Sequence, residues 1–302
     1  MDISIELAGN RLSSPLVLSS GCAGYAYELE GIVDFSCVGA VVLKSVTPEP
    51  RVGNPYPRIW EVTGGILNSI GLENVGLECL LREVVPLIKE LEVPVIASIA
   101  SDMVKGYANC ASRLEETGAF IALELNISCP NVEKGGLDFG SDPTTTAAVV
   151  KACKGNSSLP IFAKLSAAVT GLSSIAFAAA QAGADGLSLI NTIPGLAVDA
   201  WMRKPRLGAI TGGLSGPAIK PIALKAVWDC YRATGLPIIG GGGVYDVEDV
   251  IEFMICGATA VSLGTVLFND PRKVKEIAGD LPGALERLDA NSLSEIVGTL
   301  RV

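Results

Sequence analysis

Short apolar runs that alternate with helix-like segments are the feature that most constrains the fold of this chain. Eight runs can be counted, at residues 15–18, 40–43, 95–97, 121–125, 161–163, 186–190, 237–239 and 260–263. Strands that alternate with helices indicate parallel βαβ units. Eight such units in a chain of 302 residues predict an α/β fold closed into a (β/α)8 TIM barrel. We expect one domain over residues 1–302.

The segments between the runs have helical composition, and residues 292–300 are expected to form the closing helix. The other expected helices lie at residues 27–33, 76–91, 104–117, 144–152, 172–182, 217–233 and 247–255. Residues 3–7 with Arg11 indicate an N-terminal hairpin whose turn is Gly9-Asn10. Residues 48–68 are rich in Pro and Gly and predict an excursion over the barrel mouth.

Composition excludes several classes of site and partner. The chain has no histidine, which excludes Ser-His-Asp triads, His–Cys pairs and His-ligated metals. A net charge of −9 without a basic stripe argues against a nucleic-acid partner. The eight cysteines contain no CxxC pair or metal-finger spacing, so we expect no metal site and a reduced, cytoplasmic protein. No signal peptide or membrane span is expected.

A hexapeptide, Asn-Ile-Ser-Cys-Pro-Asn at residues 126–131, directly follows the fourth apolar run. It places Asn126, Cys129 and Asn131 just beyond the carboxyl end of a strand, where α/β folds hold their chemistry. Without histidine, a general base must be Cys, Asp, Glu, Lys or Tyr, and Cys129 is the best placed. A thiol has an ordinary pKa of about 8.5, nearer neutral pH than that of a hydroxyl. We therefore interpret Cys129 as a candidate base rather than a buried structural thiol.

Glycines and hydroxyls follow the last two runs. Residues 240–243 are four glycines, and Gly264-Thr265 follows the eighth run. Glycine lets backbone N–H groups approach phosphate oxygens, so this pattern predicts the phosphate site of a barrel. Residues 212–216, which end in Ser215-Gly216, offer further amide donors. The alternative is that these glycines only form tight turns.

Two lysines and an asparagine segment complete the predicted site. Lys44 and Lys164 end the second and fifth runs, where each could support an anion or pair with a neighbouring carboxylate. Together with a phosphate site, they indicate a delocalised anionic cofactor. The segment Asn-Ser-Ile-Gly-Leu at residues 68–72 could grip a carboxylate or a ring imide, or could simply form a turn.

In combination, these residues resemble the dihydroorotate dehydrogenases of the soluble class. The motifs that carry the resemblance are residues 44–45, 68–72, 126–131, 135–136, 142–143, 190–192, 203–205, 211–221 and 241–243. They cover nearly the whole chain, and residues 132–136 and 212–217 are most similar to the FMN-binding catalytic subunit of the NAD-linked subclass. The resemblance implies FMN in this chain and a partner subunit that carries FAD and a 2Fe–2S cluster. It also implies a homodimer core within a heterotetramer.

The resemblance implies a role for each candidate residue. Cys129, with Lys164 and Lys44, is catalytic: the thiol removes a proton from C5 of dihydroorotate while C6 delivers hydride to FMN. The implied FMN contacts are Ser20, Gly21, Lys44, Ser45, Ser98, Asn126, Lys164, Ile190, Ser215, Gly216, Gly242, Gly243, Gly264 and Thr265. The implied substrate contacts are Lys44, Asn68, Ser69, Ile70, Gly71, Leu72, Asn126, Asn131, Asn191 and Thr192.

Some residues depart from the family pattern, and other functions stay open. Ser98 replaces an asparagine, Cys22 a common threonine, and Pro194 an aliphatic residue. One alternative is a fumarate-linked homodimeric dihydroorotate dehydrogenase; another is a dihydropyrimidine dehydrogenase that acts on dihydrouracil, against which Asn131 argues. A barrel lyase or isomerase with a phosphorylated substrate, and a flavin-binding scaffold, are further alternatives.

Overall fold

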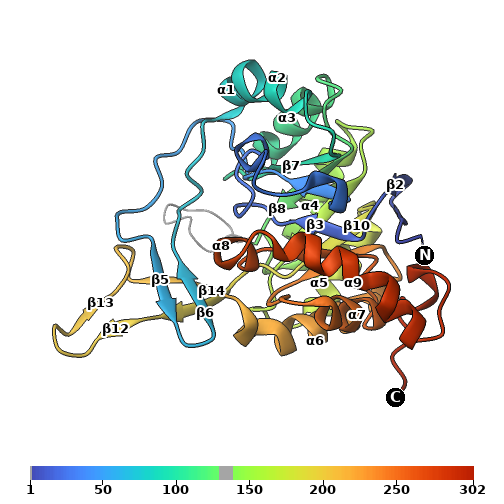
Figure 1. Ribbon diagram of the computed structural model, residues 1–302. Helices are drawn as coiled ribbons and strands as arrows, with labels where there is room; N and C mark the ends of the chain where they lie inside the picture. Colours follow the sequence, from blue (N-terminus) through green and yellow to red (C-terminus); the bar gives the residue numbers. More distant parts are fainter. Residues whose placement is uncertain (1, 129–138) are drawn as a thin grey trace.

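Eight short parallel strands close into a barrel in the computed structural model, which describes residues 2–128 and 139–302 (Figure 1). The strands are β3 (Leu16–Leu18), β4 (Ala40–Val42), β7 (Val95–Ile99), β8 (Ala122–Asn126), β9 (Ile161–Leu165), β10 (Gly186–Leu189), β15 (Ile238–Gly241) and β16 (Ala260–Leu263). They pair in chain order, and β16 pairs with β3 to close the ring. Nearly all their residues are buried because helices cover the outer face, which explains the continuous apolar runs. The predicted TIM barrel is confirmed.

Helices connect most of the strands and pack side by side around the barrel. They are α1 (Leu77–Cys79), η3 (Leu80–Val84), α2 (Val85–Ile88), α3 (Val104–Glu115), α4 (Pro143–Lys154), α5 (Leu172–Gln181), η4 (Pro217–Ile219), α6 (Lys220–Thr234) and α7 (Val247–Ile255). Neighbours in sequence, such as α3 and α4 or α5 and α6, also contact each other in space. Within the described ranges, no helix combines the length and apolarity needed to cross a bilayer.

The first and last helices differ from the prediction. Residues 27–33 contain only the short turn η1 (Tyr27–Leu29), followed by η2 (Phe35–Cys37). The barrel is closed by α8 (Val266–Asn269) and α9 (Lys273–Arg287), and the expected helix at residues 292–300 is reduced to η5 (Leu293–Glu295). The interior Pro282 of α9 obscured this helix, although its buried residues follow helical spacing. In this segment Leu293 and Ile296 are buried in the core, whereas residues 299–302 are exposed.

The N-terminal hairpin forms, but its turn is one residue earlier than predicted. Strands β1 (Ile5–Leu7) and β2 (Asn10–Leu12) pair with Leu7 opposite Asn10, so the turn is Ala8-Gly9. Both turn residues have positive φ, 48° for Ala8 and 82° for Gly9. A two-residue turn of this kind matches the twist of the strands, which places Asn10 in the second strand.

A second sheet stands at the carboxyl ends of the barrel strands (Figure 1). It joins β5 (Ile59–Val62) and β6 (Gly65–Asn68), from the predicted excursion, with β11 (Ile193–Leu196) and β14 (Thr211–Ser215). The insertion between β10 and α6 also carries the small hairpin of β12 (Val198–Asp199) and β13 (Lys204–Pro205). The sequence therefore predicted one insertion at the barrel mouth, whereas two insertions build the sheet together.

Candidate functional site

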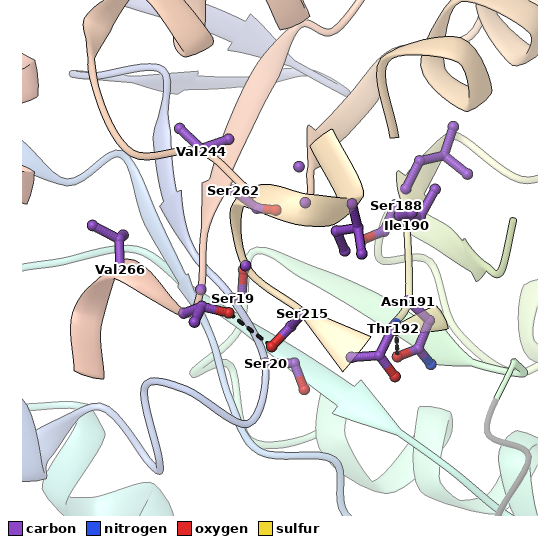
Figure 2. A pocket seen from close by; sticks show the side chains of 18 of the residues that line it. Ser19, Ser20, Ser188, Ile190, Asn191, Thr192, Ser215, Val244, Ser262 and Val266 are labelled. Carbon is purple, nitrogen blue, oxygen red and sulfur yellow. Dashed lines mark hydrogen bonds between the residues drawn. The ribbon is translucent and has the colours of Figure 1, made fainter. Parts of the chain in front are cut away.

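A pocket lies between the carboxyl ends of the barrel strands and the second sheet (Figure 2). Its walls come from β4, β8, β9, β10, β15 and β16, from the residues that follow β3, and from the segment that joins β14 to α6. Many predicted contacts line it, namely Ser20, Lys164, Ile190, Asn191, Thr192, Ser215, Gly216, Gly242, Gly243, Gly264 and Thr265. In the close view, Ser215 and the two residues Asn191 and Thr192 project from different walls.

One wall is built from backbone and is called here the glycine surface: Ser215, Gly216, Gly242, Gly243, Gly264 and Thr265. Gly216 and Gly243 have φ of 102° and 87°, a region that only glycine adopts without strain. A Cβ on Gly243 would stand 2.8 Å from the carbonyl oxygen of Gly216. A Cβ on Gly216 would stand 2.8 Å from Cα of Gly65. These backbones approach too closely for any side chain.

The amides of the glycine surface are available to a ligand. Within the described residues, the N–H groups of Gly242, Gly243, Gly264 and Thr265 donate no hydrogen bond to the chain. The hydroxyl of Thr265 donates to that of Ser215 over 2.8 Å, which joins β14 to the loop after β16. Backbone N–H donors and hydroxyls gathered in one pocket suit the oxygens of a phosphate group.

The second group consists of Ser98, Glu124, Lys164 and Ser188 and is called here the carboxylate cluster. Glu124 is buried, and its Oε1 accepts from Lys164 Nζ at 3.2 Å and from Ser98 Oγ at 3.0 Å. Its Oε2 accepts from Ser188 Oγ at 2.8 Å. Sequence reasoning missed Glu124, although a single acid inside an apolar run, two residues before Asn126, was a usable signal.

Asn126 extends this cluster toward the hexapeptide. Its amide donates to Ser45 Oγ over 3.0 Å, and Ser45 is hydrogen-bonded to Ser98 over 2.8 Å. The amide of Asn191 donates to Ser128 Oγ over 3.0 Å. Because the amide of Asn191 also donates to Asn126 Oδ1 over 3.5 Å, the predicted contacts Ser45, Ser98, Asn126 and Asn191 form one polar network, although the first three do not line the pocket. Cys129 and Asn131 lie outside the described residues.

The sequence left open whether Lys44 and Lys164 support an anion or pair with a carboxylate. In the structure, both pair with a carboxylate. Lys164 pairs with Glu124, and Lys44 Nζ lies 3.7 Å from Glu73 Oε2. Glu73 also pairs with Arg58 at 2.9 Å, and this guanidinium, with Lys44, lowers the pKa of the Glu73 carboxyl. Lys164 lines the pocket, whereas Lys44 does not.

The segment at residues 68–72 forms a turn beside the second sheet. Asn68 donates to the carbonyl of Gly213 over 3.3 Å, and Ser69 Oγ accepts from the amide of Asn54 at 2.7 Å. Gly71 and Leu72 have φ of 76° and 56°. These residues and Gly21 do not line the pocket.

The three departures from the family pattern lie in different surroundings. Ser98 is part of the carboxylate cluster, and Pro194 is exposed on β11. Burial raises the pKa of the Cys22 thiol to about 11, against an opposing effect of Lys164. Within residues 2–128 and 139–302, no three acidic or sulfur-bearing side chains gather as a metal site.

Comparisons with known proteins agree with the motifs. The family model described as dihydroorotate dehydrogenase matches residues 2–285. A relative named dihydroorotate dehydrogenase B (NAD(+)), catalytic subunit, from Desulforudis audaxviator is 45% identical over 98% of this chain and 96% of its own. Relatives of the same name from Desulforamulus reducens and Geobacillus kaustophilus are 46% and 44% identical, covering 99% and 98% of this chain and 98% and 95% of their own.

A solved structure shows the same fold. The crystal structure of DHODH from Eimeria tenella in complex with ferulenol aligns with a TM-score of 0.83. The alignment covers 99% of this chain and 88% of that chain, at 21% identity. At this identity the likeness concerns the barrel and its insertions alone.

Proposed function

We propose, for a chain that belongs to the dihydroorotate dehydrogenase family, that it oxidises dihydroorotate to orotate in pyrimidine biosynthesis, with FMN as the hydride acceptor. The family consists of oxidoreductases, and the membership that the sequence suggested is confirmed by the comparisons. The observation that carries the proposal is a single pocket that joins an amide-lined glycine surface to a buried lysine–carboxylate pair.

The glycine surface supports the FMN assignment. Gly216 and Gly243 leave room only for backbone, and the amides of Gly264 and Thr265 are available to phosphate oxygens. Lys164, from a strand on another side of the pocket, supplies a positive charge for the ring system. When bound, FMN accepts the hydride; the protein binds, orients and provides charge.

The substrate residues are proposed from the polar network. Asn126 and Asn191 offer side-chain amides, and Asn191 and Thr192 both line the pocket. Asn191 holds Ser128, the residue before Cys129, so the start of the hexapeptide is anchored to the barrel. On this basis Cys129 is the base that removes the C5 proton, and Asn131, Lys44 and residues 68–72 complete the substrate site.

The remaining assignments follow the names of the relatives. After FMN is reduced, electrons pass to NAD through a partner subunit with FAD and a 2Fe–2S cluster. The assembly is a heterotetramer with a homodimer core. The support is that the relatives are each named as the catalytic subunit of an NAD(+) enzyme. We place this assembly in the cytoplasm and treat residues 1–302 as a single FMN-binding domain.

An anaerobic spectrum tests the reaction. The purified chain is expected to show a flavin spectrum that dihydroorotate bleaches and dihydrouracil does not. Bleaching by dihydrouracil instead favours a dihydropyrimidine dehydrogenase. If the chain holds no flavin after reconstitution with FMN, the cofactor assignment is contradicted. A non-redox reaction on a phosphorylated substrate is then favoured.

The electron acceptor is tested with the same protein. The chain alone is expected to reduce neither NAD⁺ nor fumarate rapidly with dihydroorotate. Rapid reduction of fumarate favours the homodimeric subclass, and rapid reduction of NAD⁺ removes the need for a partner.

Replacement of the thiol tests the base. Cys129→Ala is expected to keep FMN and to bind orotate, yet to lose at least about 100-fold in the rate of flavin reduction at neutral pH, a typical contribution of a general base. Stopped-flow absorbance gives this rate. Cys256→Ala, a thiol on the outer helical layer, is the matched control and is expected to react normally. Normal reduction by Cys129→Ala contradicts the assignment.

A further inference from the structure

Glu124 is a buried charge that the predicted roles do not use. Its side chain is 2% exposed, and it lies on β8 in the wall of the pocket. Burying a carboxylate is costly unless it is paired and hydrogen-bonded. The Glu124 carboxylate therefore needs contacts that compensate its charge, or it serves a function at the pocket.

Three neighbouring strands supply those contacts. Ser98 on β7 and Lys164 on β9 donate to one carboxylate oxygen, at 3.0 Å and 3.2 Å, and Ser188 on β10 donates to the other at 2.8 Å. The strand register brings them together, because Ser98 is paired with Glu124 and Ser188 with Lys164. Donors on both oxygens fix the orientation of the carboxylate.

Lys164 depends on this carboxylate for its position. Its side chain is 12% exposed, and Glu124 is its ion-pair partner among the described residues. A lysine has a flexible stem, so an anchored carboxylate decides where its ammonium group stands. The same carboxylate reduces the positive charge that the ammonium group presents to the pocket, and at low exposure water screens this effect weakly.

We propose that Glu124 is a positioning residue that holds Lys164 and moderates its charge, and so sets the reduction potential of the flavin. This inference rests on the proposed function. Two-electron reduction of FMN with uptake of one proton adds one negative charge to the ring. Net positive charge beside the ring favours the reduced form, and the Glu124 carboxylate opposes that effect.

Measured potentials test the proposal. Glu124→Gln keeps the shape of the side chain and removes its charge, so it is expected to shift the equilibrium toward reduced FMN by about tenfold. This shift corresponds to about +30 mV for a two-electron couple. Anaerobic titration against a reference dye gives the value. Lys164→Met is expected to shift the equilibrium in the opposite direction.

A double variant separates positioning from a general loss of structure. Without the lysine, a buried carboxylate becomes neutral, and glutamine then differs little from it. Glu124→Gln/Lys164→Met is therefore expected to match Lys164→Met within threefold. The exposed Glu61→Gln on β5 is the matched control and is expected to match the unmodified protein. A Glu124→Gln equilibrium within threefold of the unmodified protein overturns the proposal.

Ser188→Ala decides the question if Glu124→Gln does not fold. It removes the hydroxyl dipole that partly offsets the negative potential of the carboxylate, so it is expected to favour oxidised FMN by more than threefold. An unchanged potential overturns the proposal. A chain that binds no FMN overturns the proposed function and this inference with it, whereas unchanged potentials in a protein reduced by dihydroorotate overturn this inference alone.

Discussion

At the glycine surface, backbone atoms form the wall of the pocket, whereas at the carboxylate cluster the side chains of Glu124, Lys164 and Ser188, from three strands, form it, with Ser98 behind them. Gly243 contributes its backbone amide, and because it has no Cβ, the Gly216 carbonyl can approach it closely. Glu124 contributes a charge whose cost is offset only when Ser98, Lys164 and Ser188 all reach it.

The two regions are therefore sensitive to different kinds of substitution. The glycine surface is limited by space, so any added side chain disturbs it, whatever its chemistry. The carboxylate cluster is limited by charge and hydrogen bonding, so changes of nearly equal volume disturb it. Variants that alter space alone or charge alone therefore separate the two regions.

The largest effect is expected for a loss of charge in the carboxylate cluster. Lys164→Met removes the cation of this buried pair, so Glu124 must be buried as the neutral acid, and we expect a loss of about 3–5 kcal/mol in the free energy of unfolding. Urea unfolding of protein with matched FMN content measures it. Lys225→Met is the control: its pair with Asp229 is solvent-exposed, and we expect a loss of under about 0.5 kcal/mol. Equal losses in both variants contradict the comparison.

A smaller effect is expected from added volume at the glycine surface. Gly243→Ala combines a strained φ of 87° with a Cβ 2.8 Å from the Gly216 carbonyl oxygen, and we expect a loss of about 2–3 kcal/mol. FMN content is expected to fall as well, because the amide moves.

Gly279→Ala in α9 is the matched control for that substitution. No atom lies within 4 Å of the added Cβ, and alanine favours a helix, so we expect a gain of about 0.5–1 kcal/mol and full FMN content. Full FMN content in Gly243→Ala as well shows that the glycine surface does not hold the phosphate.

The smallest effect is expected from pH. Burial raises the pKa of Cys22 from 9.0 to about 11, so the folded state favours the protonated thiol. Its contribution to stability is complete below about pH 9 and is lost as pH rises toward 11. Thermal unfolding from pH 8 to 10.5 is expected to show a smaller decline for Cys22→Ser. An identical decline in both proteins contradicts the assigned burial effect.

The barrel could be predicted because its strands are buried on both faces. This burial requires apolar runs such as residues 161–163 and 260–263, and their number indicates closure. The second sheet could not be predicted in the same way. Its strands β11 and β14 are half-exposed or rich in glycine, and β14 pairs with β6 across about half the length of the chain. Local pattern carries no information about such distant pairing.

The residues of the site also fall into two groups, those that the sequence predicts and those that it does not. Residues 240–243 and Gly264-Thr265 could be predicted from sequence, because a need for backbone approach appears directly as glycine. The glycines of the glycine surface are therefore recognisable in the local sequence, although three separate segments bring them together. Only the tertiary structure placed Ser98, Lys164 and Ser188 around Glu124, because strand register decides which polar side chains meet inside a barrel. A buried carboxylate is stable only after that register has formed, and no single segment of the chain contains its partners.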